Sequence, residues 1–448
     1  MKKEMFIDKM KKDGLNDIII KTFINYYQKL VDGEKGKLSK SEIKKPSEEK
    51  IVDYNKLEKQ ANDHLHKLAI IKLNGGLGTS MGLKKAKSLL PVKGELTFLD
   101  IIAKQVLFLR EKNKSQVPII FMNSFNTQAD TLSALAKYEN IGKQVCPLDF
   151  IQNKFPKIRK DNFMPLENKD DTLNWNPPGH GDIYSCLAQE GIIDTLLKHG
   201  IEYVFVSNSD NLGALADLKI LTYMIESQTP FMMEVCQRTE MDKKGGHLAE
   251  TKDGRLILRE SAQCPADEVE EFQDIELYNY FNTNNLWIEL KALKEYLEQN
   301  NNVIELPLII NPKKVEETDV IQLETAMGAA ISIFKDSKAI LVNRDRFAPV
   351  KKTQDLLLIW SDAYELKDDY SLQKVSKIDH LIELDSAFYG EIDQARLRFS
   401  EDIPSLKECN RFFVEGDITF GRSTVFKGNI RLIAKQPLKL DSVEISNY

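Results

Sequence analysis

The chain has 448 residues, of which 42% are hydrophobic, and a formal net charge of -6. This length accommodates about two or three domains of ordinary size, with enough apolar residues for a buried core. Acidic and basic residues are interspersed, which argues against a general nucleic-acid binder, because such a protein would concentrate its basic residues on one face. No run of eighteen apolar residues occurs, so we expect no membrane span.

The five cysteines are widely separated and form no C-x-x-C pair. This pattern is typical of buried thiols in a reducing compartment rather than of a zinc site or a disulfide framework. The first residues include acidic side chains and lack the uninterrupted apolar stretch of a secretory signal. We therefore expect a cytoplasmic protein.

The N-terminal region begins with apolar residues at helical spacing over 16–30, followed by a polar stretch over 32–50. Helical spacing of this kind predicts an amphipathic helix that packs on the rest of the protein. We interpret residues 1–60 as a helical arm and a charged linker.

From residue 68 onward, short apolar runs alternate with longer helical patterns. This alternation predicts an α/β fold with a mixed, mostly parallel Rossmann-like sheet covered by helices, over residues 61–390. Ligands in such folds bind at the carboxyl ends of the strands. The expected strands are 69–73, 118–122, 203–206, 231–235 and 339–342, and the expected helices are 98–109, 127–137, 185–199 and 324–334.

The last region, residues 391–448, has short β-prone triplets with a glycine every five to seven residues. This texture is compatible with a short left-handed parallel β-helix. A plain terminal hairpin fits the pattern about as well.

The most informative segment is 70–87, where an apolar strand runs into a loop with four glycines followed by lysines at 84, 85 and 87. Glycines allow backbone N–H groups to approach phosphate oxygens, and the lysines supply full charges. The spacing fits neither a P-loop, because Leu83 follows Gly82, nor a dinucleotide fingerprint, because Met81 stands where a third small residue is needed. The loop is thus predicted to be a phosphate cradle. A glycine-rich turn without a ligand is the alternative.

Three further segments have residue types suited to phosphate and metal chemistry. Asp210 follows the strand at 203–206, where a carboxylate could bind Mg²⁺ or merely cap the next turn. His180 lies in a Pro-Gly turn, where a histidine is more often structural than catalytic. Lys351 and Lys352 follow an apolar β-type segment, where they could hold a second phosphate or form a solvated surface.

Taken together, these segments resemble the eukaryotic-type UTP–glucose-1-phosphate uridylyltransferase (UDP-glucose pyrophosphorylase) family over nearly the whole chain. The nucleotidyltransferase-type fold is implied by this resemblance. The motifs that carry it are LNGGLGTSMG at 73–82, PPGHGD at 177–182, SNSDN at 207–211, FNTNNLW at 281–287, QLETA at 322–326 and PVK at 349–351.

The resemblance implies a reversible reaction in which glucose 1-phosphate attacks the α-phosphorus of UTP, giving UDP-glucose and pyrophosphate. By the same resemblance, Lys87 and Lys351 are the catalytic residues, and Asp210 anchors the cofactor Mg²⁺. The expected nucleotide-binding residues are Leu73, Asn74, Gly75, Gly76, Gly78, Thr79, Lys87, Gln152 and Gly179, of which Gln152 and Gly179 read the uracil edge. The expected sugar-phosphate-binding residues are His180, Asn208, Gly246, Glu260, Asn282, Asn284 and Lys351.

Two features depart from the family pattern. Lys85 and Ala86 stand where members commonly have Gly-Pro or similar, which adds a charge beside the cradle but leaves Lys87 in place. The C-terminal β-helix is short, so a monomer or a weak homo-oligomer is expected rather than an octamer.

Three other functions are alternatives to the uridylyltransferase. The first is a UDP-sugar or UDP-N-acetylhexosamine pyrophosphorylase of the same fold. The second is a Rossmann-type NAD-dependent oxidoreductase, against which Met81 counts. The third is an inactive nucleotide-binding regulator, against which the joint presence of Lys87, Asp210 and Lys351 counts.

Overall fold

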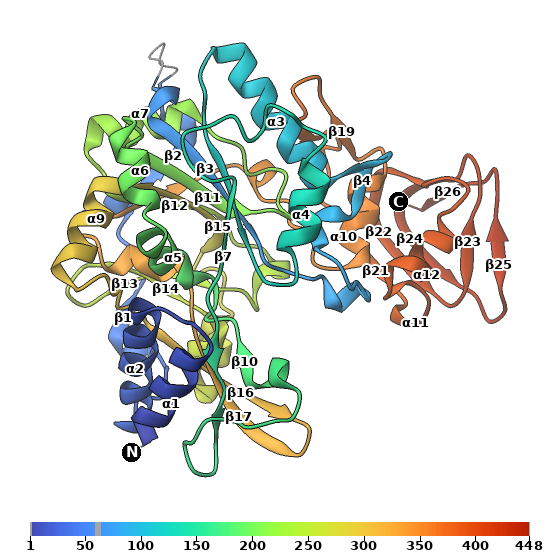
Figure 1. The fold of residues 1–448 in the computed structure, drawn as a ribbon. Coiled ribbons are helices and arrows are strands. Elements are labelled where there is room, and N and C mark those ends of the chain that lie inside the picture. Colours follow the sequence, from blue (N-terminus) through green and yellow to red (C-terminus); the bar gives the residue numbers. More distant parts are fainter. Residues whose placement is uncertain (1, 59–63, 448) are drawn as a thin grey trace.

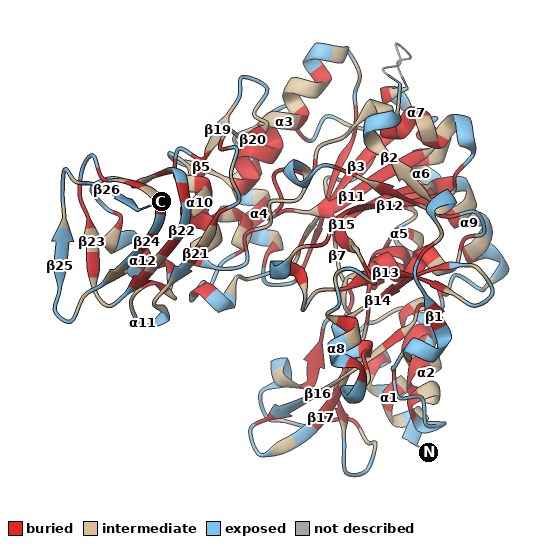
Figure 2. Ribbon diagram, turned by 180° about the vertical axis from the view of Figure 1, so that it is seen from behind, coloured by how far each residue is buried: buried red, intermediate tan, exposed pale blue. Residues whose placement is uncertain are grey.

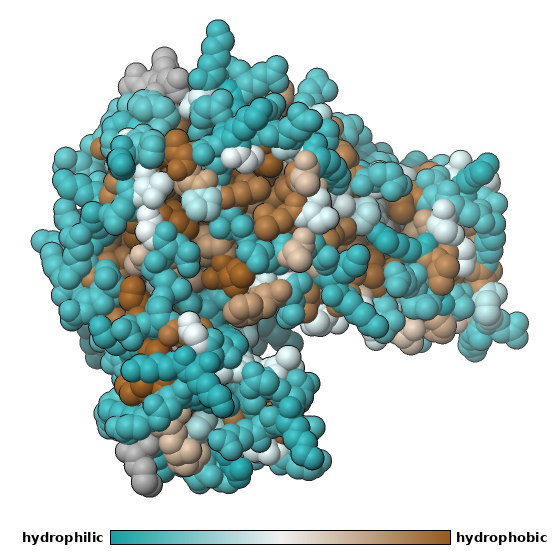
Figure 3. Space-filling view, viewed as in Figure 1, coloured by the Kyte–Doolittle hydropathy of each residue, from teal (hydrophilic) through white to brown (hydrophobic). Residues whose placement is uncertain are grey.

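The computed structural model describes residues 2–58 and 64–447, so the predicted boundary at residue 60 lies outside the described residues. Figure 1 shows a central body, a lower part that contains the N-terminal helices and a long β-ribbon, and a C-terminal coil to the right. In Figure 3 the molecular surface is hollowed between the lower part and the coil.

A large mixed sheet forms the central body, and most neighbouring strands along its main path are parallel. β15 runs antiparallel to both of its neighbours, β12 and β11. The sequence prediction of a mixed, mostly parallel sheet is thus confirmed. In spatial order the strands are β2 (Ile51–Asp53), β18 (Lys338–Leu341), β12 (Phe231–Gln237), β15 (Tyr280–Glu289), β11 (Tyr203–Asn208), β3 (Leu68–Asn74), β6 (Ile119–Asn123) and β7 (Asp149–Ile151), with β1 (Ile43–Lys44), β13 (His247–Thr251) and β14 (Leu256–Arg259) branching off β15.

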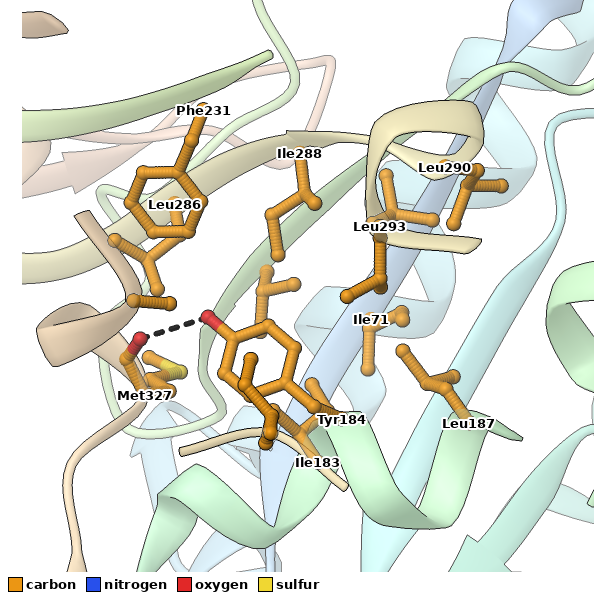
Figure 4. Close-up of a cluster of buried hydrophobic side chains, with 14 of the residues drawn as sticks. Ile71, Ile183, Tyr184, Leu187, Phe231, Leu286, Ile288, Leu290, Leu293 and Met327 are labelled. Atoms are coloured by element: carbon orange, nitrogen blue, oxygen red, sulfur yellow. Dashed lines mark hydrogen bonds between the residues drawn. The ribbon is translucent and has the colours of Figure 1, made fainter. Parts of the chain in front are cut away.

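Both faces of this sheet are buried, which explains why its strands are continuous apolar runs. Successive residues of a strand point to opposite faces, so Ile71 joins one core and Ile70 the other. Figure 4 shows the first core, in which Ile71, Leu286 and Ile288 of the sheet meet Tyr184 and residues of neighbouring helices.

The helices divide between the two faces according to the core that they contact. α5 (Ile183–Gln189), α6 (Ile192–Lys198) and α9 (Leu290–Gln299) pack on the first core. The second core is covered by α3 (Phe98–Asn113), α4 (Gln128–Leu135), α7 (Leu218–Ser227) and α10 (Thr353–Trp360).

Two of the expected helices need correction. The helix predicted at 185–199 is two helices, because Gly191 between them adopts a left-handed conformation. The prediction of a helix at 324–334 is wrong. Its first residues end strand β17 (Thr318–Thr325), which pairs along its length with β16 (Leu308–Val315), and a 3₁₀ segment at Met327–Ser332 follows. The apolar residues Ile321 and Leu323 alternate with the polar residues Gln322 and Glu324, which signals the strand.

The N-terminal helices α1 (Lys2–Lys12) and α2 (Asp17–Val31) belong to the lower part of the molecule. α2 coincides with the helix expected at 16–30. The two helices form a separate core with β16, β17 and two short strands, β8 (Phe155–Pro156) and β10 (Trp175–Asn176), which pair antiparallel as a ribbon. β9 (Ile158–Arg159) adds a third strand beside β17.

The C-terminal coil contains two sets of parallel strands. Parallel pairing excludes the plain terminal hairpin, because a hairpin is antiparallel. The coil already includes β21, so the expected domain start at residue 391 falls inside it. Its strands are β21 (Leu381–Leu384), β22 (Ser405–Glu415), β24 (Val425–Ile433) and β26 (Glu444–Asn447) in one set and β23 (Ile418–Phe420) and β25 (Leu438–Leu440) in the other, with α11 (Ser386–Tyr389) and α12 (Ile392–Arg398) alongside.

The remaining described elements are short: β4 (Pro91–Lys93) with β5 (Leu96–Thr97), β19 (Tyr364–Leu366) with β20 (Leu372–Lys374), and α8 (Val269–Phe272). None of the helices in the described ranges has the length and apolar character needed to cross a membrane.

Candidate active site

The glycine loop leaves the carboxyl end of β3 and turns back on itself. The Lys87 N–H donates to the Gly76 carbonyl at 3.0 Å, and short turns within the loop use the carbonyls of Gly78 and Thr79. The start of the loop is fixed to the neighbouring strand β11, because the backbone N–H and Oγ of Ser209 both donate to the Leu73 carbonyl. The loop therefore lies at the edge of the sheet that the sequence predicts for ligand binding.

Lys87 and Asp210 meet at this edge. The Nζ of Lys87 lies 2.6 Å from Oδ2 of Asp210, and both side chains are mostly buried. The other carboxylate oxygen, Asp210 Oδ1, is buried and has no hydrogen-bond partner among the described residues. A buried carboxylate oxygen without a partner is unfavourable, so this atom is suited to a further ligand.

Lys351 is held close to the same place by its backbone. The Val350 N–H donates to the Asp210 carbonyl at 3.2 Å, and Ser80 Oγ of the glycine loop donates to the Lys351 carbonyl at 3.2 Å. The Lys351 N–H donates to Asp355 in the first turn of α10. Lys87, Asp210 and Lys351, which we call the charged rim, thus come together from three distant parts of the chain.

A buried polar network lies beneath the charged rim, and the sequence analysis did not find it. Asn211 Oδ1 accepts from the Ala348 N–H at 3.0 Å, and its Nδ2 donates to the Arg346 carbonyl at 3.1 Å. Arg346 in turn forms two short hydrogen bonds to Glu234, which also accepts from Trp287 Nε1. Asn211 therefore joins the loop of Asp210 to the segment that carries Lys351. Its position inside the SNSDN motif was the available signal.

Gln152 and Gly179, which we call the ribbon edge, flank the β8/β10 ribbon. Gly179 has a φ of +81°, and a Cβ there would lie 2.4 Å from the Thr325 carbonyl oxygen, so only glycine fits. Gln152 lies against Gly75 of the glycine loop, where a Cβ would be 3.1 Å from Gln152 Nε2. The Gly75 carbonyl also accepts from Ser124 Oγ. The ribbon edge and the glycine loop therefore line one site.

The two sides of the ribbon edge are joined by a buried hydrogen-bond pair. The N–H and Nδ2 of Asn153 donate to the two carboxylate oxygens of Asp182, at 2.6 and 3.0 Å. Burial raises the pKa of Asp182, although these bonds oppose the shift. The pair holds the residue next to Gln152 against the turn that contains Gly179.

His180 is fixed by the backbone of the 3₁₀ segment. Its Nδ1 accepts from the Met327 N–H at 2.9 Å, and the Met327 carbonyl accepts from Tyr184 in the core, as Figure 4 shows. Burial lowers the pKa of His180 to about 4. The ring is therefore neutral near pH 7, and because Nδ1 is an acceptor, the proton lies on Nε2, which can donate to a ligand.

The predicted sugar-side residues form a second group at the same edge. A Cβ at Gly246 would lie 2.6 Å from Oε2 of Glu260, and the Gly246 carbonyl accepts from the Asn282 N–H. Burial raises the pKa of Glu260, and the Lys351 ammonium partly opposes that shift. The Lys351 ammonium is thus close enough to Glu260 to affect its charge.

Asn282 and Asn284 hydrogen-bond to each other, and Asn284 adopts a positive φ of 58°. Asn208 ends β11, and the antiparallel register that pairs Val206 with Leu286 brings it toward Asn284, which lies in the middle of β15. These amides are hydrogen-bonding groups suited to hydroxyls.

One predicted residue has a different position. The Asn74 side chain is buried and donates to Asn123 and Thr131, so its amide supports the sheet and only its backbone borders the site. The other predicted residues lie on the loop, the charged rim, the ribbon edge or the sugar side.

The residues fit Mg²⁺ through Asp210. Within the described ranges, no group of three or more His, Cys, Asp or Glu side chains could hold a metal ion. The open Oδ1 of Asp210 offers one carboxylate, which suits Mg²⁺ because this ion usually binds one or two carboxylates and completes its shell with water and phosphate oxygens.

The charges of the rim can hold two phosphate groups side by side and stabilise the charge that develops when one attacks the other. With the glycine loop and the parallel sheet, this arrangement defines a nucleotidyltransferase. The model of the UTP–glucose-1-phosphate uridylyltransferase family matches residues 20–427, and the chain belongs to this family.

Individual relatives agree with this assignment. The UTP–glucose-1-phosphate uridylyltransferase of Hordeum vulgare is 41% identical over 450 residues, which cover 96% of this chain and 94% of that protein. A UDP-glucose pyrophosphorylase mutant from Leishmania major, solved in complex with UDP-glucose, superposes with a TM-score of 0.92 at 39% identity, covering 100% of this chain and 98% of that one. UDP-glucose phosphorylase from Trypanosoma brucei gives a TM-score of 0.87 at 39% identity, covering 100% of both chains.

Proposed function

We propose that the chain catalyses the reversible, Mg²⁺-dependent transfer of a uridylyl group from UTP to glucose 1-phosphate. An oxygen of glucose 1-phosphate forms a bond to the α-phosphorus of UTP, while the bond from that phosphorus to the bridging oxygen breaks. The electron pair departs with pyrophosphate, and UDP-glucose is formed. No general base is required, because a phosphate monoester is already anionic at neutral pH.

The observation that carries this proposal is the charged rim between the glycine loop and the sugar side. Lys87 contacts Asp210, and the backbone of Val350 and Lys351 bonds both to Asp210 and to the loop. A triphosphate bound by the loop and a sugar phosphate beside Glu260 would therefore meet at these charges.

The two lysines have complementary roles in this proposal. Lys87, at the end of the glycine loop, stabilises the α-phosphate and the departing pyrophosphate as charge develops on them. Lys351, on the Glu260 side, holds the sugar phosphate in line for attack. Positioning and electrostatic stabilisation are sufficient for phosphoryl chemistry, in which the protein forms no covalent intermediate.

Asp210 would hold Mg²⁺ through its open Oδ1. When bound, the ion supplies positive charge to the phosphate oxygens and draws the two phosphates together. The Lys87–Asp210 contact keeps this carboxylate oriented toward the phosphates.

Recognition of the base and the sugar is assigned to hydrogen-bonding groups outside the charged rim. The Gln152 amide and the Gly179 backbone can distinguish uracil from cytosine, because the two bases exchange a donor for an acceptor. The amides of Asn208, Asn282 and Asn284, the Glu260 carboxylate and the backbone of Gly246 face the sugar hydroxyls. His180 Nε2 donates to the sugar phosphate.

The proposal is tested by a pyrophosphate-release assay with UTP, TTP, CTP or ATP and glucose, galactose or N-acetylglucosamine 1-phosphate. We expect UTP with glucose 1-phosphate to give the highest kcat/KM. Turnover with none of the pairs would overturn the proposal. A preference for another sugar 1-phosphate would favour the UDP-sugar or UDP-N-acetylhexosamine enzyme instead.

Three further properties belong to the same proposal. We infer that the parallel C-terminal strands form a left-handed β-helix, that any homo-oligomer is weak, and that the protein is cytoplasmic. The last inference is supported by the five cysteines, all of which are buried free thiols. A crystal structure would test the handedness of the β-helix. Sedimentation over a range of protein concentrations would test the weak homo-oligomer.

A further inference from the structure

The N-terminal helices contact the β8/β10 ribbon directly. Phe23 of α2 meets the ring of Phe155 in β8 edge-on, at 5.2 Å between centroids. Lys9 of α1 lies 5.5 Å above the ring of Trp175 in β10 and donates to the Leu166 carbonyl. Figure 1 shows α1 and α2 beside β10 in the lower part of the molecule.

This ribbon lies between the two residues of the ribbon edge. β8 begins three residues after Gln152, and β10 ends three residues before Gly179. Trp175 pairs with Pro156 and Asn176 with Phe155, so a displacement of either strand would change the separation of Gln152 and Gly179.

Lys154 connects the helices, the ribbon and the glycine loop. Its Nζ forms a 2.5 Å ion pair with Asp13, which lies between α1 and α2. The same ammonium lies 4.4 Å from the Trp175 ring and 5.4 Å from the Phe125 ring. Phe125 directly follows Ser124, whose Oγ donates to the Gly75 carbonyl. One cation thus touches the turn between α1 and α2, strand β10 and the segment beside the glycine loop.

The exposure of these groups matters for the strength of the contact. The side chains of Lys154 and Asp13 are only 22% and 23% exposed, so water screens their attraction less than at an open surface. A partly desolvated ammonium also gains from the aromatic faces. Phe125 itself remains 60% exposed, and the Lys154 ammonium is one of its contacts.

We propose that α1 and α2 are a positioning element for nucleotide recognition, acting through the Asp13–Lys154 ion pair. This inference rests on the proposed uridylyltransferase function and extends it, because it assigns Asp13 and Lys154 as positioning residues for uracil selectivity. The contact fixes the ribbon and, through it, the spacing of Gln152 and Gly179. It leaves the charged rim untouched.

The test uses the full-length variants Asp13→Asn, Lys154→Met and the double variant, with steady-state kinetics for UTP and CTP. We expect the KM for UTP to rise about threefold to tenfold, with kcat within about twofold of wild type, because the lost contact combines an ion pair with cation–π attraction. The ratio of kcat/KM for UTP over CTP should fall. The double variant should show no larger rise in KM than Lys154→Met, because both substitutions break the same ion pair.

Lys29→Met is the matched control, because it breaks a second ion pair between α2 and the body, Lys29–Glu305 at 3.4 Å, away from the ribbon. It should leave the KM for UTP and the selectivity unchanged. Equal changes in Lys29→Met and Lys154→Met would overturn the proposal, as would wild-type UTP kinetics and selectivity in Asp13→Asn. A uniform loss of kcat toward both substrates would also overturn it, since that indicates general destabilisation.

The failure of this proposal differs from the failure of the proposed function. Wild-type protein that turns over no substrate pair would contradict the function. The effect of the N-terminal helices would then be measured by equilibrium titration of UTP and CTP into wild type and Asp13→Asn. If the Asp13→Asn variant bound UTP and CTP with the same affinities as wild type, the positioning role would be contradicted.

Discussion

The charged rim and the ribbon edge differ in what supports them. The rim is held from within the central body, where Asn211 and Glu234 are buried beneath it and the Arg346 side chain is mostly buried. The ribbon edge has inner supports such as the Asn153–Asp182 pair, and an outer support from α1 and α2 that remains partly exposed.

This difference separates two requirements of the proposed reaction. Transition-state stabilisation needs charges that do not move as the reaction proceeds, and a buried network supplies that rigidity. Recognition of the base needs correct spacing, which peripheral elements can adjust at little cost to the chemical step. Variants of the rim should therefore lower kcat, whereas variants of the ribbon edge should raise the KM for UTP.

The largest effect is expected from Lys87→Met, which keeps the length of the side chain but removes its charge. We expect kcat to fall by about 10²–10³-fold, because the lysine should act most strongly on charge that develops in the transition state. Equilibrium binding of UTP should persist. Stopped-flow measurement of pyrophosphate release would check this, with Lys85→Met, at an exposed position, expected to differ little from wild type. Near wild-type turnover in Lys87→Met would remove this residue from the mechanism.

Asp210→Asn should abolish the dependence on Mg²⁺ with a loss of about 10²-fold or more in kcat, because one carboxylate is the protein's contribution to the ion. Wild-type activity should also disappear when the divalent cations are chelated and return when Mg²⁺ is added. A Mg²⁺ titration of kcat in both proteins checks the prediction. Full wild-type activity in the presence of a chelator would contradict the role of Asp210.

Asn211→Ala tests whether the buried network positions the rim. We expect a fall of about 10–100-fold in kcat with a smaller change in the KM for UTP, as for residues that orient catalytic groups. Asn174, which is similarly buried but lies next to β10 and away from the charged rim, provides the matched control. Asn174→Ala should lower stability in a denaturant titration without the same loss of kcat. Equal kinetic losses in the two variants would show that rim position is not specific to Asn211.

The smallest effect is expected from the pH dependence of His180→Asn. The asparagine side-chain oxygen can still accept a hydrogen bond from the Met327 N–H. In wild type the folded ring resists protonation because its pKa is lowered to about 4, whereas the unfolded ring binds a proton below about pH 6.5. The unfolded state therefore binds more protons between these values, and stability falls as the pH falls from 6.5 toward 4. The variant should lose less stability over this range.

Urea unfolding at pH 7, 6 and 5 would check this prediction. The kcat/KM of His180→Asn for glucose 1-phosphate should fall several-fold at every pH. The variant lacks the Nε2–H donor, and this loss does not depend on protonation of the ring. An equal loss of stability with pH in both proteins would show that the His180 ring is not held neutral.

Much of the fold was predictable because buried parallel strands are continuous apolar runs. The strands at 69–73, 203–206 and 231–235 coincide with β3, β11 and β12 for that reason. The prediction of a helix at 324–334 was wrong because the apolar spacing fits a helix locally, whereas the pairing of β17 with β16 determines the structure of its first residues. Local periodicity does not include the hydrogen bonds that a distant strand supplies.

The candidate site divides in the same way. The glycine loop, Asp210 and Lys351 were visible because phosphate chemistry requires small residues and charges within short motifs. Asn211, Asp13 and Lys154 were not singled out, because an asparagine in a turn or a lysine between two loops has no distinctive local pattern. Their roles depend on partners more than a hundred residues away along the chain.

Short-range patterns were sufficient to predict the mixed, mostly parallel sheet, the glycine loop and the types of residue that border it. Which of these residues meet became clear only from the packing of the whole chain. Lys87, Asp210 and Lys351 converge because β3, β11 and the segment before α10 end at one edge, and α1 and α2 cover the β8/β10 ribbon because their apolar faces need a partner. Such meetings arise from packing over the whole chain, which no short segment encodes.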